Sequence, residues 1–150
     1  MYEAYFNGAC GPVNPGGTAT YGAAIFQDGN RVWECAEVYC PEPGDEPKTS
    51  NNVAEYCGLL AALHWFADQG LFEAQIIVYG DSKLVIEQMF GSWKIRKGAY
   101  VPLALAAQRL LRQFKNIKGR WIPREKNEIA DELSKSALVR EGVPFRIQPH

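Results

Sequence analysis

Residues 76–82 read Ile-Ile-Val-Tyr-Gly-Asp-Ser, and this stretch decides the fold of the 150-residue chain. Its four consecutive apolar residues, 76–79, predict a central β-strand that is covered on both faces. Asp81 stands at the end of this strand, just before a helix predicted over 83–90. Open α/β sheets carry their functional sites at the carboxyl ends of such strands, so Asp81 is a candidate site residue.

The amino-terminal part of the chain predicts a three-stranded antiparallel meander. Runs with strand character occupy residues 3–10, 18–27 and 31–40, and the glycine- and proline-rich loop 11–17 separates the first two. Asp28-Gly29 favours a tight hairpin between the second and third strands because both residue types tolerate positive φ.

Helices and one further strand complete the pattern. Ser50, Asn51 and Asn52 are good N-cap residues for a helix that ends near Gln69, with Gly70 as its stop. Two more helices are predicted over 101–114 and 127–140, with a short strand at 121–122 between them. The order βββαβα(α)βα predicts an α/β fold with a five-stranded mixed sheet, in which parallel strands join the meander and helices flank both faces.

Composition indicates one domain. The chain is 47% hydrophobic and contains no low-complexity run, and its length suffices for a sizeable core. Neither a signal peptide nor an apolar run of about 20 residues is evident, so we expect a cytoplasmic protein without a membrane contact. The four cysteines fit neither a redox nor a zinc motif, which predicts reduced, mostly buried thiols.

The net charge of −1 conceals an uneven distribution. Residues 1–81 contain two basic and eleven acidic side chains, whereas residues 82–150 contain fourteen basic and six acidic ones. Two interpretations stay open, namely a polyanion contact on one side of the molecule and a solvated helix face. The basic excess is densest in Lys83, Lys94, Arg96, Lys97, Arg109, Arg112, Lys115, Lys118, Arg120, Arg124 and Lys126.

Three carboxylates and one amide outline a metal site. Glu55 lies about one turn inside the helix that begins near residue 51, Asp131 lies one turn inside the last helix, and Asn7 stands at the tip of the first strand. Two divalent ions about 4 Å apart can clamp an in-line phosphoryl displacement, and several converging carboxylates must hold them. Taken singly, each acid has an ordinary explanation as a cap or a surface charge. Glu55 shares its helix stripe with Leu59, Ala62 and Phe66.

Four segments, taken together and in order, resemble the successive motifs of type 1 ribonuclease H across nearly the whole chain. The segments are YFNGACGPVNPGGTATYG, TSNNVAEYCGLLAAL, VYGDSKLVIEQM followed by GSWKI, and WIPREKNEIADELSKSAL. The short WIPREKNEIAD segment is most similar to the compact prokaryotic branch. The resemblance implies a ribonuclease H-like fold and one ribonuclease H domain over 1–150, with roughly the last ten residues as a tail.

The resemblance also implies an activity. Family members hydrolyse the RNA strand of RNA/DNA hybrids with two Mg²⁺ ions, for which Mn²⁺ can substitute, and leave 3′-hydroxyl and 5′-phosphate ends. The acid quartet of the family falls on Asn7, Glu55, Asp81 and Asp131, so that position 7 bridges both ions. Asn7 replaces the bridging Asp, and an amide lacks the negative charge that holds a cation, so we expect little or no cleavage. Arg124 stands where many members carry a mobile His, either as its substitute or as a surface cation.

Binding residues are implied on the same basis. Asn51 and Glu55 would meet the RNA strand, although Ser50 and Asn51 also suit simple capping. Trp93 and Lys94 would contact the DNA strand, with a place at the edge of the core as the alternative for Trp93. The remaining candidates for nucleic-acid contact are Gly8, Ala9, Cys10, Gly11, Asn14, Thr49, Ser50, Asn52 and Ser82.

Three hypotheses follow for the function. The first is a ribonuclease H1 that carries an inactivating Asp→Asn change at residue 7, made to trap substrate. The second is a naturally inactive module that binds RNA/DNA hybrids, and the third is another nuclease on the same fold. In each case we expect a monomer without an obligatory protein partner. The loop 11–17 lacks the Gly-Lys-Ser/Thr ending of a nucleotide-binding loop and opens no helix.

Overall fold

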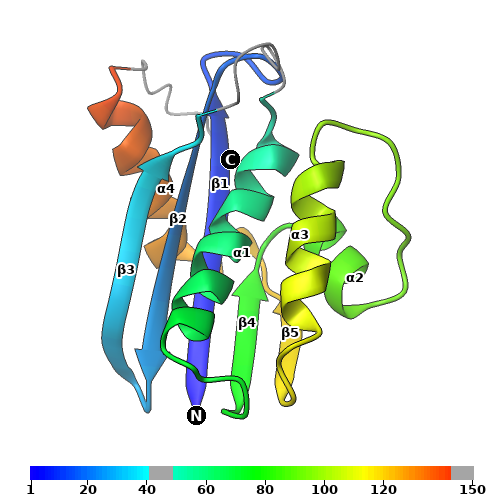
Figure 1. Cartoon of the computed structure of the whole chain (residues 1–150). Helices are drawn as coiled ribbons and strands as arrows, with labels where there is room; N and C mark the ends of the chain where they lie inside the picture. Colours follow the sequence, from blue (N-terminus) through cyan, green and yellow to red (C-terminus); the bar gives the residue numbers. More distant parts are fainter. Residues whose placement is uncertain (41–48, 143–150) are drawn as a thin grey trace.

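The computed structural model describes residues 1–40 and 49–142, which form five strands, four α-helices and one short 3₁₀ helix (Figure 1). The acidic loop 41–47 and most of the expected tail lie outside the described residues. The elements are β1 (Tyr2–Gly11), β2 (Thr18–Gln27), β3 (Asn30–Val38), α1 (Asn51–Asp68), β4 (Ile76–Gly80), α2 (Lys83–Phe90), α3 (Val101–Leu111), β5 (Ile117–Trp121), η1 (Arg124–Lys126) and α4 (Glu128–Arg140).

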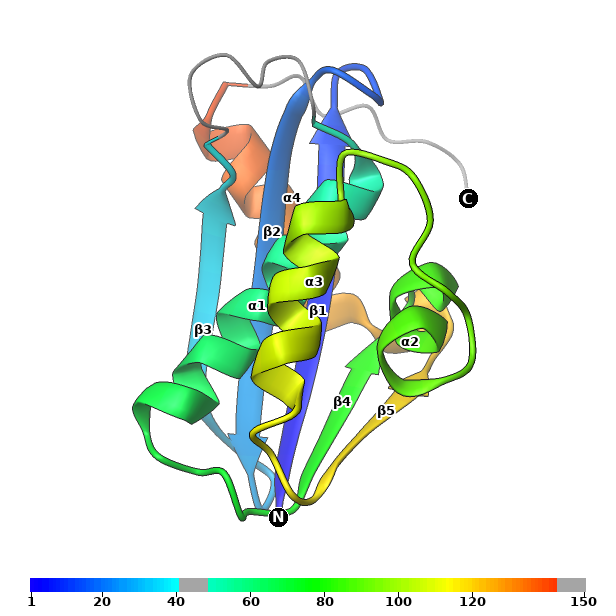
Figure 2. The ribbon, with the colours of Figure 1, turned by 45° about the vertical axis from the view of Figure 1, so that its right-hand side comes forward.

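The strands form one mixed sheet in the order β3-β2-β1-β4-β5. β1, β2 and β3 pair antiparallel, while β4 pairs parallel to both β1 and β5. Helices α1 and α2 pack on one face of the sheet, with α3 against both of them, and α4 packs on the other face, as Figures 1 and 2 show. The predicted α/β fold with a five-stranded mixed sheet is therefore confirmed.

Local signals place the hairpin and the first helix as expected. Asp28 and Gly29 both adopt positive φ, 49° and 86°, which suits the turn between β2 and β3. Ser50 caps α1, since its hydroxyl oxygen accepts a hydrogen bond from the Val53 amide at 3.1 Å. The stripe of α1 that carries Glu55 faces the sheet, and Phe66 on that stripe is fully buried.

Glycines let two helices approach the sheet closely where β1 and β2 pair. A Cβ at Gly8 would lie 2.3 Å from the Glu55 amide nitrogen, and one at Gly22 would lie 2.5 Å from Leu133 Cβ. Both distances are far inside van der Waals contact. Helices α1 and α4 can therefore occupy these positions only because no side chain projects from the strands there.

Several expectations need correction. The last strand, β5, covers 117–121 rather than 121–122, because its pairing with β4 recruits residues whose own pattern is weak. Helix α3 ends at Leu111 instead of residue 114. Strand β4 is fully covered on the face toward α1 only, since Ile77 and Tyr79 on the other face are half-buried. The thiols are free, but Cys57 is the one that is buried.

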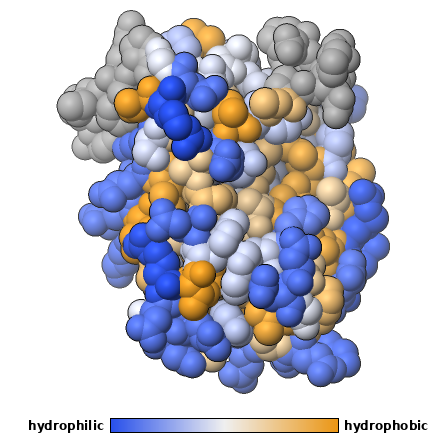
Figure 3. Space-filling model, turned by 60° about the vertical axis from the view of Figure 1, so that its left-hand side comes forward, coloured by the Kyte–Doolittle hydropathy of each residue, from blue (hydrophilic) through white to orange (hydrophobic). Residues whose placement is uncertain are grey.

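The open edge of the sheet is polar. Arg31, Glu34 and Glu37 lie on the edge strand β3 and are exposed, which discourages pairing with another chain. The side of the molecule that carries β3 accordingly shows hydrophilic residues interspersed with small hydrophobic patches (Figure 3).

Within the described ranges, no helix combines the length and the apolar character that a membrane span requires.

The close approach of α1 to β1 predicts an effect on stability. Gly8→Ala should lower the free energy of unfolding by about 3 kcal/mol, because either the strand or the helix backbone must move. Gly29→Ala is the control, since a Cβ there would meet no described atom within 4 Å and would add only the cost of positive φ, about 1–2 kcal/mol. Urea denaturation measures both, and equal losses would contradict the steric argument.

Candidate active site

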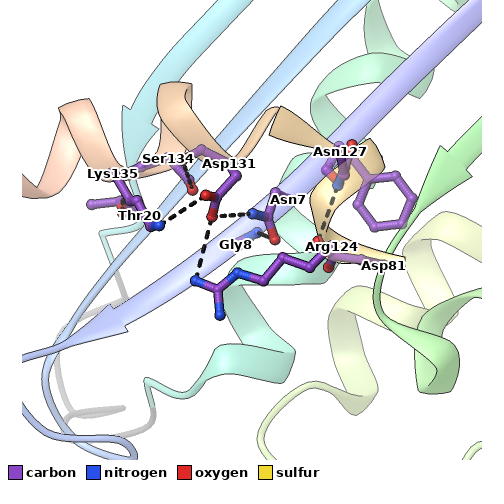
Figure 4. A network of polar contacts seen from close by, with 10 residues as sticks. Asn7, Gly8, Thr20, Asp81, Arg124, Asn127, Asp131, Ser134 and Lys135 are labelled. Carbon is purple, nitrogen blue, oxygen red and sulfur yellow. Dashed lines mark hydrogen bonds and ion pairs between the residues drawn. The ribbon is translucent and has the colours of Figure 1, made fainter. Parts of the chain in front are cut away.

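The structure brings the four predicted site residues together at the carboxyl end of β4. Asn7 comes from β1, Glu55 from α1, Asp81 from the end of β4 and Asp131 from the first turn of α4. Figure 4 shows the Asn7 side chain directed toward Asp131, with Asp81 on the other side beside Asn127. Four separate elements thus converge on one polar cluster, as the sequence predicted.

Asn7 is hydrogen-bonded through both ends of its amide and is 5% exposed. Its Oδ1 accepts a hydrogen bond from the Gly8 amide at 2.9 Å, and its Nδ2 donates to Asp131 Oδ1 at 3.0 Å. The amide therefore supplies a donor at the position where two acids would otherwise face each other. A carboxylate at residue 7 could not make this second bond when ionised.

Two cations also contact Asp131. Lys135 Nζ lies 2.8 Å from Asp131 Oδ2, and Arg124 reaches from η1 to within 3.6 Å of Oδ1. Figure 4 shows the long Arg124 side chain extended across the cluster toward this carboxylate. Arg124 is thus part of the cluster, although its side chain remains 49% exposed.

Glu55 is the deepest carboxylate of the cluster, since Asp81 and Asp131 are only half-buried. The Glu55 residue is 7% exposed, and its Oε2 has no hydrogen-bond partner among the described residues. Burial raises the pKa of Glu55 well above its ordinary value, and the nearby Asp81 carboxylate raises it further.

Asn127 is a site residue that the sequence reasoning missed. It is 1% exposed, and its Nδ2 donates to the Phe6 carbonyl oxygen at 2.9 Å and to Asp81 Oδ2 at 3.3 Å. Burial raises the pKa of Asp81, and the hydrogen bond from Asn127 partly offsets this effect. An Asn just before a helix is typical of an N-cap, but this side chain makes no capping bond within the described chain. It holds Asp81 beside β1 instead.

The donor set suits a divalent cation only in part. Carboxylate oxygens are ligands that Mg²⁺ prefers, and the unpartnered Oε2 of Glu55 is a buried acceptor that a cation would satisfy. On the other side, however, the Nδ2 of Asn7 is a hydrogen-bond donor, which cannot ligate a cation, and it engages Asp131 Oδ1. Among residues 1–40 and 49–142, no three acidic, His or Cys side chains are grouped closely enough to hold a metal ion.

Known proteins share this architecture. A family model described as "Reverse transcriptase-like" matches residues 7–137. The crystal structure of ribonuclease H1 from the archaeon Halobacterium salinarum is 34% identical, with a TM-score of 0.78, and the match covers 93% of this chain and 98% of that one. The chain belongs to the type 1 ribonuclease H family.

Two further family members have solved structures. The amino-terminal ribonuclease H domain of a Mycobacterium tuberculosis protein is 34% identical with a TM-score of 0.80, and the match covers 94% of this chain and 95% of that one. LC11-RNase H1, solved in complex with an RNA/DNA hybrid, is 29% identical with a TM-score of 0.81, over 94% and 99% of the two chains.

The curated relatives of this ribonuclease H homologue are longer. The chain spans 32% of the length of a bifunctional protein of Mycobacterium tuberculosis, to which it is 38% identical over 125 residues. It spans 63% of the length of ribonuclease HI from Halobacterium salinarum, to which it is 34% identical over 136 residues.

The predicted RNA-strand residues lie around the amino end of α1. The Asn14 side-chain oxygen accepts a hydrogen bond from the Asn51 amide at 3.0 Å, so this loop helps to cap the helix. Thr49 is buried and donates its hydroxyl to the Gly17 carbonyl, which turns it toward the loop rather than outward. Asn51 and Asn52 are exposed. The segment Gly8-Ala9-Cys10-Gly11 is the end of β1 and is half-buried.

Ser82 acts as a cap, while the neighbouring side chains of Trp121 and Lys83 form a cation–π pair that is a new candidate for nucleic-acid contact. The Ser82 hydroxyl oxygen accepts a hydrogen bond from the Val85 amide at the start of α2, at 3.3 Å. Trp121, which is 48% exposed, donates its indole N–H to the Asp81 carbonyl oxygen at 3.1 Å. Lys83 Nζ lies 5.8 Å from the centre of the Trp121 ring. In the sequence, the signal for Trp121 is its place between the basic residues Lys118 and Arg120 and the charged segment 124–126.

The basic residues do not form a single face. Trp93, which is 46% exposed, and Lys94 lie on the connection between α2 and α3, so Trp93 is no part of the core. Lys118 and Arg120 are paired in β5 with Ile77 and Tyr79 of β4, and they point to the sheet face opposite α1. A nucleic-acid contact can therefore use only some of the basic residues that the sequence concentrates between Lys83 and Lys126.

The buried Glu55 carboxylate predicts a pH-dependent stability. Because its pKa is raised in the folded state, the folded protein binds this proton more tightly than the unfolded chain does. In EDTA, the free energy of unfolding should therefore fall as pH rises from the ordinary carboxyl range, about 4.3, through the raised pKa. Glu55→Gln should remove most of this fall, with the raised pKa of Asp81 accounting for the remainder, and should stabilise the protein at neutral pH, as urea denaturation across a pH series would measure.

A surface acid supplies the control for this experiment. Glu132→Gln, on the exposed side of α4, removes one charge without touching the cluster and should keep the fall in stability. If Glu55→Gln instead kept the pH profile of the parent chain, the Glu55 carboxylate would not be the source of the fall in stability.

Proposed function

We propose that this chain is a ribonuclease H1 that binds RNA/DNA hybrids and cleaves their RNA strand weakly or not at all, because Asn7 replaces the first catalytic Asp. The observation that carries this proposal is the 3.0 Å hydrogen bond from Asn7 Nδ2 to Asp131 Oδ1. With an Asp at residue 7, both positions would offer carboxylate oxygens to divalent cations. Here residue 7 presents an amide donor to Asp131 instead.

The other acids retain the roles that the family pattern implies. Glu55 and Asp81 would hold one Mg²⁺, or Mn²⁺ as a substitute, and Asp131 would hold the second. Such ions, when bound, act as Lewis acids that stabilise both the attacking and the leaving oxygens of an in-line phosphoryl displacement. Asn127 keeps the Asp81 carboxylate oriented through its 3.3 Å hydrogen bond. Arg124 is the candidate substitute for the mobile His, since it already reaches Asp131.

Hybrid binding has separate support. LC11-RNase H1, which shares the fold of this chain at 29% identity, was solved in complex with an RNA/DNA hybrid. In our proposal the exposed Asn51 and Asn52 at the start of α1 meet the RNA strand, where the helix end also offers amide donors to phosphate. Trp93 and Lys94 meet the DNA strand from the α2–α3 connection.

The broader assignment completes the proposal. Residues 1–150 constitute one ribonuclease H domain of the compact prokaryotic branch, which leaves 3′-hydroxyl and 5′-phosphate ends when it is active. Cytoplasmic location and a monomeric state stay predictions. The alternative function is a naturally inactive hybrid-binding module. One observation supports it, namely that Asp131 already contacts Asn7, Lys135 and Arg124. The substitution Asn7→Asp distinguishes a nuclease from a binding module.

Asn7→Asp should restore metal-dependent cleavage of RNA in a hybrid, by at least about a hundredfold, because the missing charge is that of the bridging ligand. The same substitution should lower the melting temperature in EDTA, since two carboxylates then lie about 3 Å apart, and Mg²⁺ should reverse this loss. A labelled-hybrid cleavage assay and thermal unfolding measure the two effects.

Asn116→Asp is the matched control, because Asn116 precedes β5 at the end of the sheet away from the cluster, where its side-chain amide donates to the Glu73 carbonyl oxygen. It should restore nothing. Addition of Asp81→Asn to the restored chain should abolish cleavage again. If the Asn7→Asp chain folds and binds hybrid but stays silent with both Mg²⁺ and Mn²⁺, the chain is a binding module rather than a masked nuclease.

The chain as it stands should bind an RNA/DNA hybrid with an affinity that falls linearly with salt on logarithmic axes, because phosphate contacts release counterions. Combined Trp93→Ala and Lys94→Ala should weaken this binding about tenfold and reduce the salt slope by roughly one. Lys118→Ala, on the opposite sheet face, should leave both unchanged. Fluorescence anisotropy across a salt series measures these quantities, and equal losses for single-stranded RNA would place the DNA-strand contact elsewhere.

A further inference from the structure

A buried polar cluster lies between α1, α2 and α3, outside the carboxylate site. Its centre is Gln88 of α2, which is 7% exposed. The Tyr56 hydroxyl of α1 donates to Gln88 Oε1 at 2.6 Å, and the Tyr56 ring stacks on Tyr100 at 5.6 Å between centroids and 4° between planes. A buried side-chain amide of this kind requires a structural reason, because its desolvation is costly unless its groups are paired.

The second half of the Gln88 amide fixes the connection between α2 and α3. Its Nε2 donates to the Lys94 carbonyl oxygen and to the Tyr100 hydroxyl, both at 3.1 Å. The Tyr100 hydroxyl in turn accepts a hydrogen bond from the Arg96 amide at 3.3 Å. Two backbone groups of the connection are thus satisfied by buried side chains rather than by a helix or a sheet.

This connection carries the basic loop, defined here as residues 92–97. Figure 2 shows the connection from α2 to α3 as a long excursion at the side of the molecule. The loop contains no helix or strand, and its Trp93, Lys94, Arg96 and Lys97 are exposed. The loop is also held by the Trp93 amide, which donates to the Glu87 carbonyl oxygen at 3.1 Å, and by Ile95, which packs against the core. Without Gln88, the Lys94 carbonyl would lose this buried partner, and the backbone around it would sample more conformations.

We propose that Gln88 is a positioning residue for hybrid binding: it holds the Lys94 backbone so that Trp93 and the adjacent cations are preset for the DNA strand before the nucleic acid arrives. This proposal rests on the proposed function of the same loop. Pre-organisation raises affinity because the cost of ordering the loop is met on folding rather than on binding. Gln88 touches no nucleic acid itself and acts only through the loop.

A double-mutant cycle tests this role. Gln88→Met keeps the length and packing of the side chain but removes its hydrogen bonds, and it should weaken hybrid binding about tenfold. In a chain that already carries Trp93→Ala and Lys94→Ala, the same change should cost less than about twofold, since the contacts it positions are gone. A merely structural role would give equal losses in both backgrounds.

Two tyrosine variants supply a second route and a matched control. Tyr100→Phe keeps the ring stacked on Tyr56 but removes the hydroxyl that links Gln88 to the Arg96 amide, so it too should weaken binding. Tyr79→Phe removes a hydroxyl that donates to Glu3 at 3.1 Å on the opposite sheet face, and it should leave affinity unchanged. Circular dichroism verifies folding of each variant, and hydrogen exchange at the Arg96 amide should accelerate in Gln88→Met and Tyr100→Phe alone.

The outcomes are distinguishable. Failure of the parent chain to bind hybrid would overturn the proposed function, and the binding role of Gln88 with it. If the parent binds while Gln88→Met and Tyr100→Phe both keep its affinity, only the positioning role is overturned. Additive losses in the cycle, or unchanged exchange at the Arg96 amide, would overturn it as well.

Discussion

The contact between β1 and α1 at Gly8 is the constraint on which the rest of the structure depends. The helix lies so close to the strand that a single Cβ at Gly8 would collide with the Glu55 backbone. This closeness buries Glu55 beside Asn7, which lies in the middle of β1 rather than at the strand tip that the sequence predicted, because the pairing of β1 with β2 continues to Gly11. On the other face, Gly22 admits α4 in the same way and brings Asp131 within hydrogen-bond distance of Asn7. Close packing of the helix and strand backbones therefore assembles the cluster, although the acids repel one another.

Assembly of these acids has an electrostatic cost, which the chain offsets locally. Asp131 is met by Lys135, Arg124 and the Asn7 amide, and Asp81 is met by Asn127. Glu55 is the acid that keeps a buried oxygen without a partner among the described residues, as Asn127 does through its Oδ1, and burial raises the pKa of Glu55. The amide at residue 7 thus removes one repulsion and adds one attraction. The Asn7 amide therefore stabilises the cluster when no cation is bound.

The two regions proposed to meet nucleic acid are ordered in different ways. The carboxylate cluster is built on β1, β4, α1 and α4, so that regular secondary structure fixes its geometry. The basic loop has no such support, and buried side chains supply its order instead through Gln88, Tyr56 and Tyr100. Rigid elements suit chemistry that tolerates little misplacement, whereas a loop held by a few hydrogen bonds can adapt to a duplex surface.

The sequence by itself determined the types and order of the elements, the hairpin at Asp28-Gly29, the Ser50 cap and the four residues of the cluster. These features follow from local periodicity, turn chemistry and motif spacing, which act over a few residues. Only the tertiary structure decided that β5 begins at Ile117, that Glu55 rather than Asp81 lies deepest, and that Asn127 and Gln88 are organising residues. The physical reason is that burial and hydrogen-bond partners depend on groups that are distant in the chain and meet only on folding.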